Sequence, residues 1–137
     1  MMKFLEEELV ILVIHKSAED YLEAILMLQE RIGVVHSVDI ANELGLSKPS
    51  VSVAMKKLRE NGYISMAQDG RITLNESGMK IASSIYDRHK TITKLFESLG
   101  VSSEVAMADA CKVEHDLSEE TFTKLCAFME KMEKKSE

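Results

Sequence analysis

The order of turn signals between residues 37 and 74 constrains the fold of this chain more than any other feature. Ser37 begins an amphipathic segment that Gly45 ends, and Ser47 begins a second one over residues 48–60. Ser is favoured immediately before a helix, and Gly immediately after one. Only the short turn at residues 45–48 separates the two segments. The pattern therefore predicts a helix-turn-helix motif.

A β-hairpin is predicted directly after this motif. Two short β-prone runs, residues 63–66 and 71–74, flank Asp69-Gly70. Asp-Gly between such runs is a strong hairpin signal, because both residues tolerate the dihedral angles of a tight turn. A hairpin in this position is the wing of a winged helix-turn-helix.

Helical signals surround the motif. Ser17 is predicted to cap a first helix that ends near Gly33, and a long helix is predicted over Glu76–Leu99. Ser102 or Ser103 begins a helix through about His115, and Ser118 caps the last one. With one Pro and no Trp, the composition also favours helices. We expect a mainly α fold with a small β-hairpin. Its parts are a 1–16 extension, a 17–78 winged helix-turn-helix DNA-binding domain and a 79–137 helical domain.

Composition excludes several classes of protein. Hydrophobic residues make up 45% of the chain, too many for intrinsic disorder, and two cysteines are too few for a disulfide scaffold. The longest apolar run, Leu9–Ile14, is far shorter than a transmembrane helix, and the acids at Glu6–Glu8 are unlike a secretory signal. We expect a cytoplasmic protein with reduced thiols and no membrane partner.

A basic stretch lies in this otherwise acidic chain. The net charge is −6, yet residues 47–59 contain no acid. Binding to phosphate depends on the local potential, so double-stranded DNA is the expected partner of the second helix and the wing. A solvated helix face, with Ser47 only as a cap, is the alternative interpretation. The candidate DNA-binding residues are Ser47, Lys48, Pro49, Ser50, Ser52, Lys56, Lys57 and Arg59, with Arg71 on the wing.

A second group of residues has the chemistry of metal ligands. One predicted helix carries a thiol, a carboxylate and an imidazole at positions i, i+3 and i+4, which places them on one face. If donors from three helices converge, their mixture of N, O and S suits a divalent transition metal. Each residue also has an ordinary explanation, such as a core histidine, a small buried thiol or acids at a helix start. The residues are Cys111, Glu114 and His115, with Asp20, Glu23 and His89.

Five motifs together resemble the diphtheria-toxin-repressor and manganese-transport-regulator family of metal-dependent transcriptional repressors. The motifs are Ser17–Glu23, Val38–Leu44, Ser47–Ser52, Tyr86–His89 and Asp109–His115. The resemblance implies a homodimer whose C-terminal helical domain binds metal and dimerises. It implies the metal ligands Asp20, Glu23, His89, Cys111, Glu114 and His115. It leaves Leu125, Phe128, Met129 and Met132 as a dimer face or as intrachain core.

The ligand set is a hybrid of two family types. Manganese-type members carry an acid at the position of Cys111, and iron-type members carry Met at the position of Asp20. An iron-type carboxylate one turn after His89 is replaced by Thr93. Since thiolates favour softer metals and carboxylates harder ones, the expected cofactor is Mn(II) or Fe(II), with Zn(II) or Co(II) able to bind in vitro.

The expected function is metal-dependent repression. Metal binding would shift the dimer to a geometry that binds operator DNA, controlling metal-uptake genes. No nucleophile–base set or phosphate loop points to an enzyme, and no small organic ligand is expected. The alternative is a winged-helix regulator that metal does not gate, with Cys111 structural or redox-active.

Overall fold

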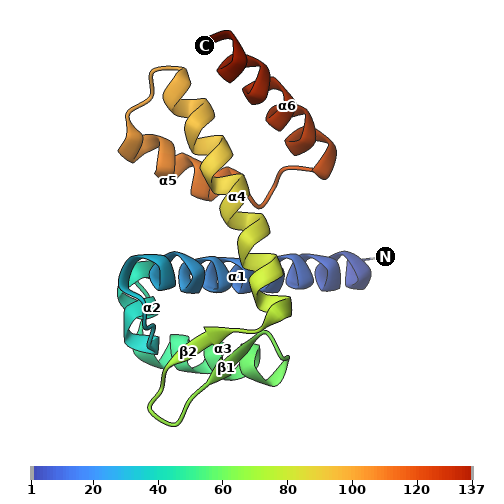
Figure 1. Cartoon of the computed structure of the whole chain (residues 1–137). Coiled ribbons are helices and arrows are strands. Elements are labelled where there is room, and N and C mark those ends of the chain that lie inside the picture. The colour runs from blue at the N-terminus through green and yellow to red at the C-terminus, as the bar shows by residue number, and fades with distance from the viewer. Residues whose placement is uncertain (1, 137) are drawn as a thin grey trace. The chain divides into compact units, whose positions relative to one another are not determined.

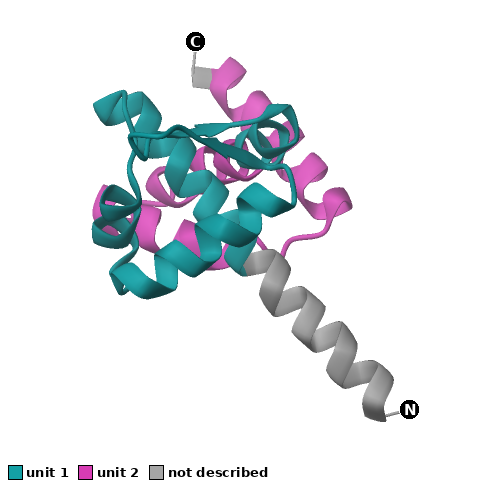
Figure 2. Ribbon diagram, turned by 90° about the horizontal axis from the view of Figure 1, so that it is seen from below, with its two compact units in different colours: residues 1–84 teal, residues 85–137 magenta. Residues whose placement is uncertain are grey.

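The structure is a computed structural model that describes the backbone of residues 2–136 and the side chains of residues 17–135 (Figure 1). The chain divides into two compact units, Met1–Ser84 and Ile85–Glu137, drawn in different colours in Figure 2. The elements in order are α1 (Met2–Ile32), α2 (Ser37–Leu44), α3 (Lys48–Glu60), β1 (Ile64–Met66), β2 (Ile72–Leu74), α4 (Glu76–Ser98), α5 (Ser103–Val113) and α6 (Glu119–Ser136).

Unit 1 is a winged helix-turn-helix, which confirms the predicted fold class. Strands β1 and β2 pair antiparallel, with Met66 opposite Ile72, and form the wing. The N–H of Ile72 also donates to the carbonyl of Val35 at 2.8 Å, which ties the wing to the segment before α2. The core under these elements is apolar and buried, and includes Leu22, Ile25, Ile40, Val51, Met55 and Ile64.

The turn between α2 and α3 forms as the sequence predicts. Gly45 has φ +66°, a left-handed conformation that Gly adopts at little cost, and the N–H of Leu46 donates to the carbonyl of Ala41. The hydroxyl of Ser47 accepts the N–H of Ser50 at 3.3 Å and so caps α3. These local bonds hold α3 in place as the second helix of the motif.

Gly78 lies in the first turn of α4, against the main chain of Tyr63 just before β1. A Cβ at this position would lie 2.1 Å from the carbonyl oxygen of Tyr63, so any residue other than glycine would clash with the main chain. That oxygen accepts the N–H of Asn75 at 2.9 Å. A glycine inside a helix is usually a weakness. Here it allows the first turn of α4 to pack directly on the start of β1.

Two predicted helix starts are wrong. Ser17 lies inside α1, which begins at Met2, because residues 2–16 contain no Gly or Pro to stop a helix before it. The residue before α2 is His36 and not Ser37. The N–H of His36 donates to the carboxylate of Asp39 at 2.8 Å. This acid therefore satisfies a main-chain N–H group at the start of α2, where Ser37 was predicted to be the cap.

Unit 2 contains the rest of α4 with α5 and α6. Ser102 precedes α5, and the hydroxyl of Ser118 accepts the N–H of Thr121 at 3.1 Å at the start of α6, both as predicted. The buried apolar residues of this unit include Ile85, Ile92, Ala106, Ala110 and Met129. None of the helices in the described part of the chain is long and apolar enough to cross a bilayer.

Candidate metal centre and nucleic-acid interface

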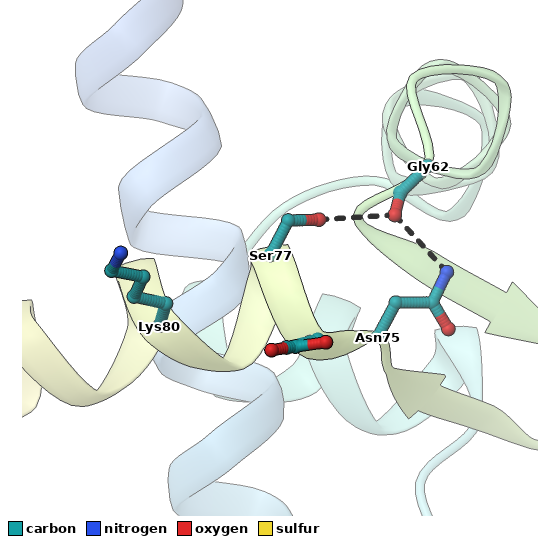
Figure 3. A pocket seen from close by; sticks show the side chains of 5 residues that line it. Gly62, Asn75, Ser77 and Lys80 are labelled. Carbon is teal, nitrogen blue, oxygen red and sulfur yellow. Dashed lines mark hydrogen bonds between the residues drawn. The ribbon is translucent and has the colours of Figure 1, made fainter.

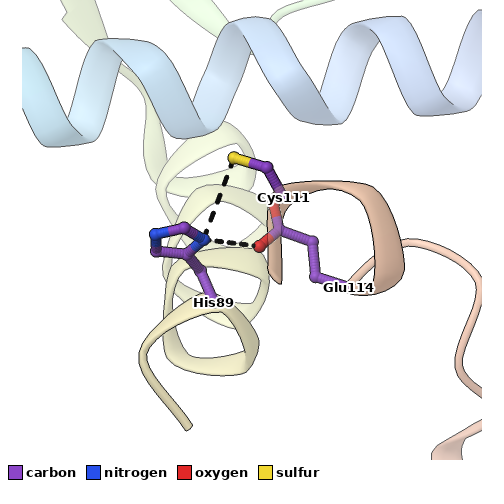
Figure 4. A group of neighbouring side chains, drawn as sticks. All are labelled: His89, Cys111 and Glu114. Carbon is purple, nitrogen blue, oxygen red and sulfur yellow. Dashed lines mark hydrogen bonds and ion pairs between the residues drawn. The ribbon is translucent and has the colours of Figure 1, made fainter. Parts of the chain in front are cut away.

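Three of the predicted ligands lie together in unit 2. The Nδ1 atom of His89 is 2.9 Å from a carboxylate oxygen of Glu114 and 3.9 Å from the sulfur of Cys111 (Figure 4). One ligand atom from each residue lies within 4.8 Å of the others. We call these three residues the His–Cys–Glu cluster. His89 and Glu114 are buried, whereas Cys111 is exposed.

The cluster is assembled from two elements. His89 is in the middle of α4, and Cys111 is in the last turn of α5. The predicted helix ends two residues early, at Val113, so Glu114 and His115 follow it in a turn. Glu114 keeps helical dihedral angles, φ −58° and ψ −30°. Its side chain therefore still projects on the same side as Cys111, three residues earlier.

Glu114 is the most deeply buried member of the cluster. Its side chain has no exposed surface. The second carboxylate oxygen, Oε1, accepts no hydrogen bond from the described residues and is 3.4 Å from Nε2 of His115. Burying a carboxylate is costly unless positive charge and hydrogen bonds compensate. Imidazole, thiolate and carboxylate together are a donor set that fits a divalent transition metal.

The remaining predicted ligands are found in both units. His115 is adjacent to Glu114 and its side chain is 2% exposed. Asp20 and Glu23 lie one turn apart on α1 of unit 1, the first half-buried and the second buried. A buried carboxylate such as Glu23 again needs compensation. Their role as ligands stays a prediction.

Thr93 stands one turn after His89 on α4. Its side chain is buried, and its hydroxyl makes no hydrogen bond to the described residues. This position contributes a neutral hydroxyl and no carboxylate to its surroundings.

Arg88 contacts the same region, and sequence reasoning missed it. Its guanidinium donates to the carbonyls of Glu114 and Leu117 and to the carboxylate of Glu119, at 3.3, 2.7 and 3.1 Å. These partners lie 26 to 31 residues further along the chain. Two of them are main-chain atoms, which carry no sequence signal. The one hint was its place beside His89 in the Tyr86–His89 motif.

One face of α3 is exposed and basic, as a nucleic-acid interface requires. The buried residues of the helix are Val51, Met55 and Leu58. Lys56 lies 4.0 Å from Glu60, a loose exposed pair. The predicted DNA-binding residues Ser47, Lys48, Pro49, Ser50, Ser52, Lys56, Lys57 and Arg59 are all exposed.

Arg71 lies at the tip of the wing and is also exposed. Its Nε is 2.8 Å from the carboxylate of Asp69, and its backbone N–H donates to the same side chain at 3.1 Å. The backbone bond, followed by the bond to the guanidinium, holds the pKa of Asp69 below its ordinary value. Asp69 is thus ionised at neutral pH. Because Asp69 pairs with Nε of Arg71, the Nη1 and Nη2 groups of the guanidinium remain available to a phosphate.

A shallow pocket lies where α3, the wing and α4 meet (Figure 3). The side chains of Asn75 and Ser77 both donate to the carbonyl of Gly62, at 3.1 and 3.2 Å. Glu76 and Lys80 complete the lining. The bonds fix the end of α3 to the start of α4, which explains the polar lining without a ligand.

The predicted dimer residues of α6 differ in exposure. Met129 is buried and Leu125 is half-buried. Phe128 and Met132 are 53% and 42% exposed. The assignment of all four to a dimer face stays a prediction.

Family models match almost the whole chain. Residues 14–71 match the N-terminal DNA binding domain of the iron dependent repressors, and residues 75–137 match their metal binding and dimerisation domain. An uncharacterized HTH-type transcriptional regulator of Methanocaldococcus jannaschii is 40% identical over 123 residues, covering 88% of this chain and 98% of its own length. The transcriptional regulator MntR of Salmonella typhimurium is 36% identical over 110 residues, covering 80% and 70%.

A solved structure, titled a manganese-dependent transcriptional repressor in complex with manganese, has a TM-score of 0.73 and 28% identity. The match covers 80% of this chain and 51% of that one, so the chain spans about half the length of the solved relative. The fold, both family models and the relatives agree with the resemblance seen in the motifs. The chain belongs to the iron dependent repressor family of metal-dependent, DNA-binding transcriptional regulators.

Proposed function

We propose that this chain is a homodimeric repressor that binds operator DNA when a divalent metal occupies its C-terminal unit. The observation that carries the proposal is the His–Cys–Glu cluster, with its donor atoms within 4.8 Å, in a segment that matches a metal binding and dimerisation domain. His115 joins the proposed ligands because it is beside Glu114. Asp20 and Glu23 join the proposed ligands as a carboxylate pair at i and i+3 on α1, within the Ser17–Glu23 motif of the resemblance.

The proposed cofactor is Mn(II) or Fe(II). Glu114 supplies a hard oxygen; the matching family is named for iron, and a structural relative is named for manganese. Cys111 supplies a softer donor, which raises the affinity for Fe(II), Co(II) and Zn(II) relative to Mn(II). The chain is therefore expected to bind Zn(II) or Co(II) in vitro as well.

The proposed mechanism is a shift between populations of the dimer. When bound, the metal supplies positive charge and directed coordination bonds to Glu114 and its neighbours. Metal-free protein would sample several geometries, of which only some space two recognition helices for an operator. If metal binds the competent geometry more tightly, operator DNA must tighten metal binding by the same factor.

The DNA-binding part of the proposal rests on residues 17–78 and the metal-binding part on residues 79–137. The exposed cations Lys48, Lys56, Lys57, Arg59 and Arg71 would contact phosphates. The regulated genes are proposed to be those of metal uptake. We propose a cytoplasmic site of action and no catalytic activity, since the relatives are named as transcriptional regulators.

Fluorescence anisotropy tests this proposal. A labelled duplex from the gene's own upstream region is titrated anaerobically with protein at fixed salt, with Mn(II), Fe(II), Zn(II) or chelator present. We expect affinity to rise steeply with one metal and to collapse with chelator. Equal affinity with chelator would support a regulator that metal does not gate.

A pair of histidine variants makes the test specific. His89→Ala removes a member of the cluster, whereas His36→Ala removes an imidazole from the segment before α2 in the other unit. We expect only His89→Ala to abolish the response to metal. A full response in His89→Ala would contradict the proposed site.

A further inference from the structure

Arg88 and His89 are consecutive residues of α4, and both contact Glu114. The ring of His89 meets the Glu114 carboxylate at 2.9 Å, and the guanidinium of Arg88 donates to the Glu114 carbonyl at 3.3 Å. Two neighbouring residues of α4 thus hold both the side chain and the main chain of Glu114.

The guanidinium is itself held in place from several directions. Its Nη1 atom also donates to the carbonyl of Leu117 at 2.7 Å, and its Nη2 atom donates to Glu119 at 3.1 Å. The group lies over the ring of Phe122, 4.9 Å from its centre, and the Arg88 side chain is only 12% exposed. Arg88 therefore connects the turn after α5 to the first turn of α6.

This arrangement matters because Glu114 lies beyond the end of α5. Residues 114–116 form a turn and not a helix, so the hydrogen bonds of α5 alone do not hold the Glu114 carbonyl. A planar guanidinium can bridge several acceptors at fixed angles, which a lysine ammonium cannot reproduce.

We propose that Arg88 is a positioning residue of the candidate metal centre. It holds the main chain from Glu114 to Leu117, so that the carboxylate faces His89 and Cys111 before metal arrives. The proposal rests on the metal-binding function proposed above. Residues that orient metal ligands in this way commonly change metal affinity by about 10- to 100-fold.

Cobalt binding to the full chain tests the role of Arg88. Co(II) is titrated anaerobically into wild type, Arg88→Gln, Arg88→Lys and Lys90→Gln, and absorbance follows the thiolate charge-transfer and ligand-field bands. Lys90→Gln is the matched control, because it removes the same charge next to His89. Lys90 is exposed and lies over the ring of Tyr86, 3.9 Å from its centre. Circular dichroism checks that each variant is folded.

We expect both Arg88 variants to bind Co(II) about 10-fold or more weakly, with shifted ligand-field bands at saturation. Lys90→Gln should remain within about twofold of wild type, since it breaks no contact to Glu114. If Arg88→Gln does not fold, the Co(II) affinity of Arg88→Lys alone tests the proposal. The proposal is overturned by wild-type affinity in Arg88→Gln, by full recovery in Arg88→Lys, or by an equal loss in Lys90→Gln. Absence of cobalt binding by the wild type would contradict the metal function itself.

Discussion

The basic face of α3 and the His–Cys–Glu cluster represent two ways of building a functional surface. Along α3 the candidate residues lie within 13 positions of one another in sequence, from Ser47 to Arg59, and all of them are exposed. In the cluster the residues come from α4, from α5 and from the turn after α5; two of the three are buried, and they contact one another directly. The first surface is specified by one amphipathic helix, and the second by tertiary packing.

The comparison shows where a substitution should be tolerated. Exposed charges such as Lys57 interact weakly with their neighbours in water, so their effects should be small and additive. Glu114 has no exposed surface, and its partners are close enough for their effects to be coupled. Changes in the cluster should therefore be larger and not additive.

The largest expected effect is from Glu114→Gln. It keeps the side-chain shape but removes a charged ligand, so metal affinity should fall by more than about 100-fold, beyond the usual loss from outer-shell changes. Metal-free stability should change much less, because Gln keeps the shape of the side chain and can still form a hydrogen bond with the ring of His89. Calorimetric metal titration and thermal denaturation measure both, with exposed Glu120→Gln as control. A strong metal response in Glu114→Gln would remove the contrast between the two surfaces.

The next effect is from the double variant Lys48→Ala, Lys57→Ala. The proposed homodimer carries four of these lysines, so the loss of four phosphate contacts should weaken binding by at least about tenfold for every DNA sequence and reduce the salt slope by about 3.6. Metal affinity should be unchanged without DNA. Anisotropy over a salt series measures the slope, and Lys124→Ala, Lys131→Ala on α6 removes the same charge as a control. An unchanged slope would mean that α3 does not contact phosphate.

Cys111→Asp should change the metal preference of the site without abolishing metal binding. Replacing a thiolate by a carboxylate should lower the ratio of Zn(II) to Mn(II) affinity by about tenfold or more. Competition titrations measure the ratio. Cys126→Ser, at the other free cysteine, should leave it unchanged. An unaltered ratio in Cys111→Asp would exclude Cys111 as a ligand.

The smallest effect is expected from Asp69→Asn on the wing. Removing the acid beside Arg71 should raise DNA affinity about two- to threefold at low salt, and the gain should vanish at high salt. Anisotropy at two salt concentrations measures this, with Glu104→Gln on α5 as control. Lower affinity in Asp69→Asn would mean that Asp69 orients Arg71 for DNA.

The ion pair between Asp69 and Arg71 also predicts the direction in which pH changes the stability of the fold. The folded-state pKa of Asp69 is lowered, chiefly by the N–H of Arg71. Any stability from this interaction is therefore present above the ordinary carboxyl pKa and is lost as the pH falls through the lowered value. Denaturation of wild type and Asp69→Asn across the acid range should show a difference that shrinks as the pH falls.

Most of the fold was predictable because its signals are local. Gly45, Ser47 and Ser118 act where the sequence places them, since caps and turns depend on a few neighbouring residues. The errors at Ser17 and Ser37 have the same origin. A serine caps a helix only where the preceding chain leaves the helical conformation, and at α2 the carboxylate of Asp39 satisfies the N–H of His36.

The sequence by itself determined the winged helix-turn-helix, the exposed basic face of α3 and the residue types that could hold a metal. Periodicity and capping act over a few residues, so they can be interpreted without coordinates. Only the tertiary structure decided that His89 meets Cys111 and Glu114, and that Arg88 holds the carbonyls of Glu114 and Leu117. Those contacts join residues 22 to 29 positions apart, where packing and not local preference sets the distance.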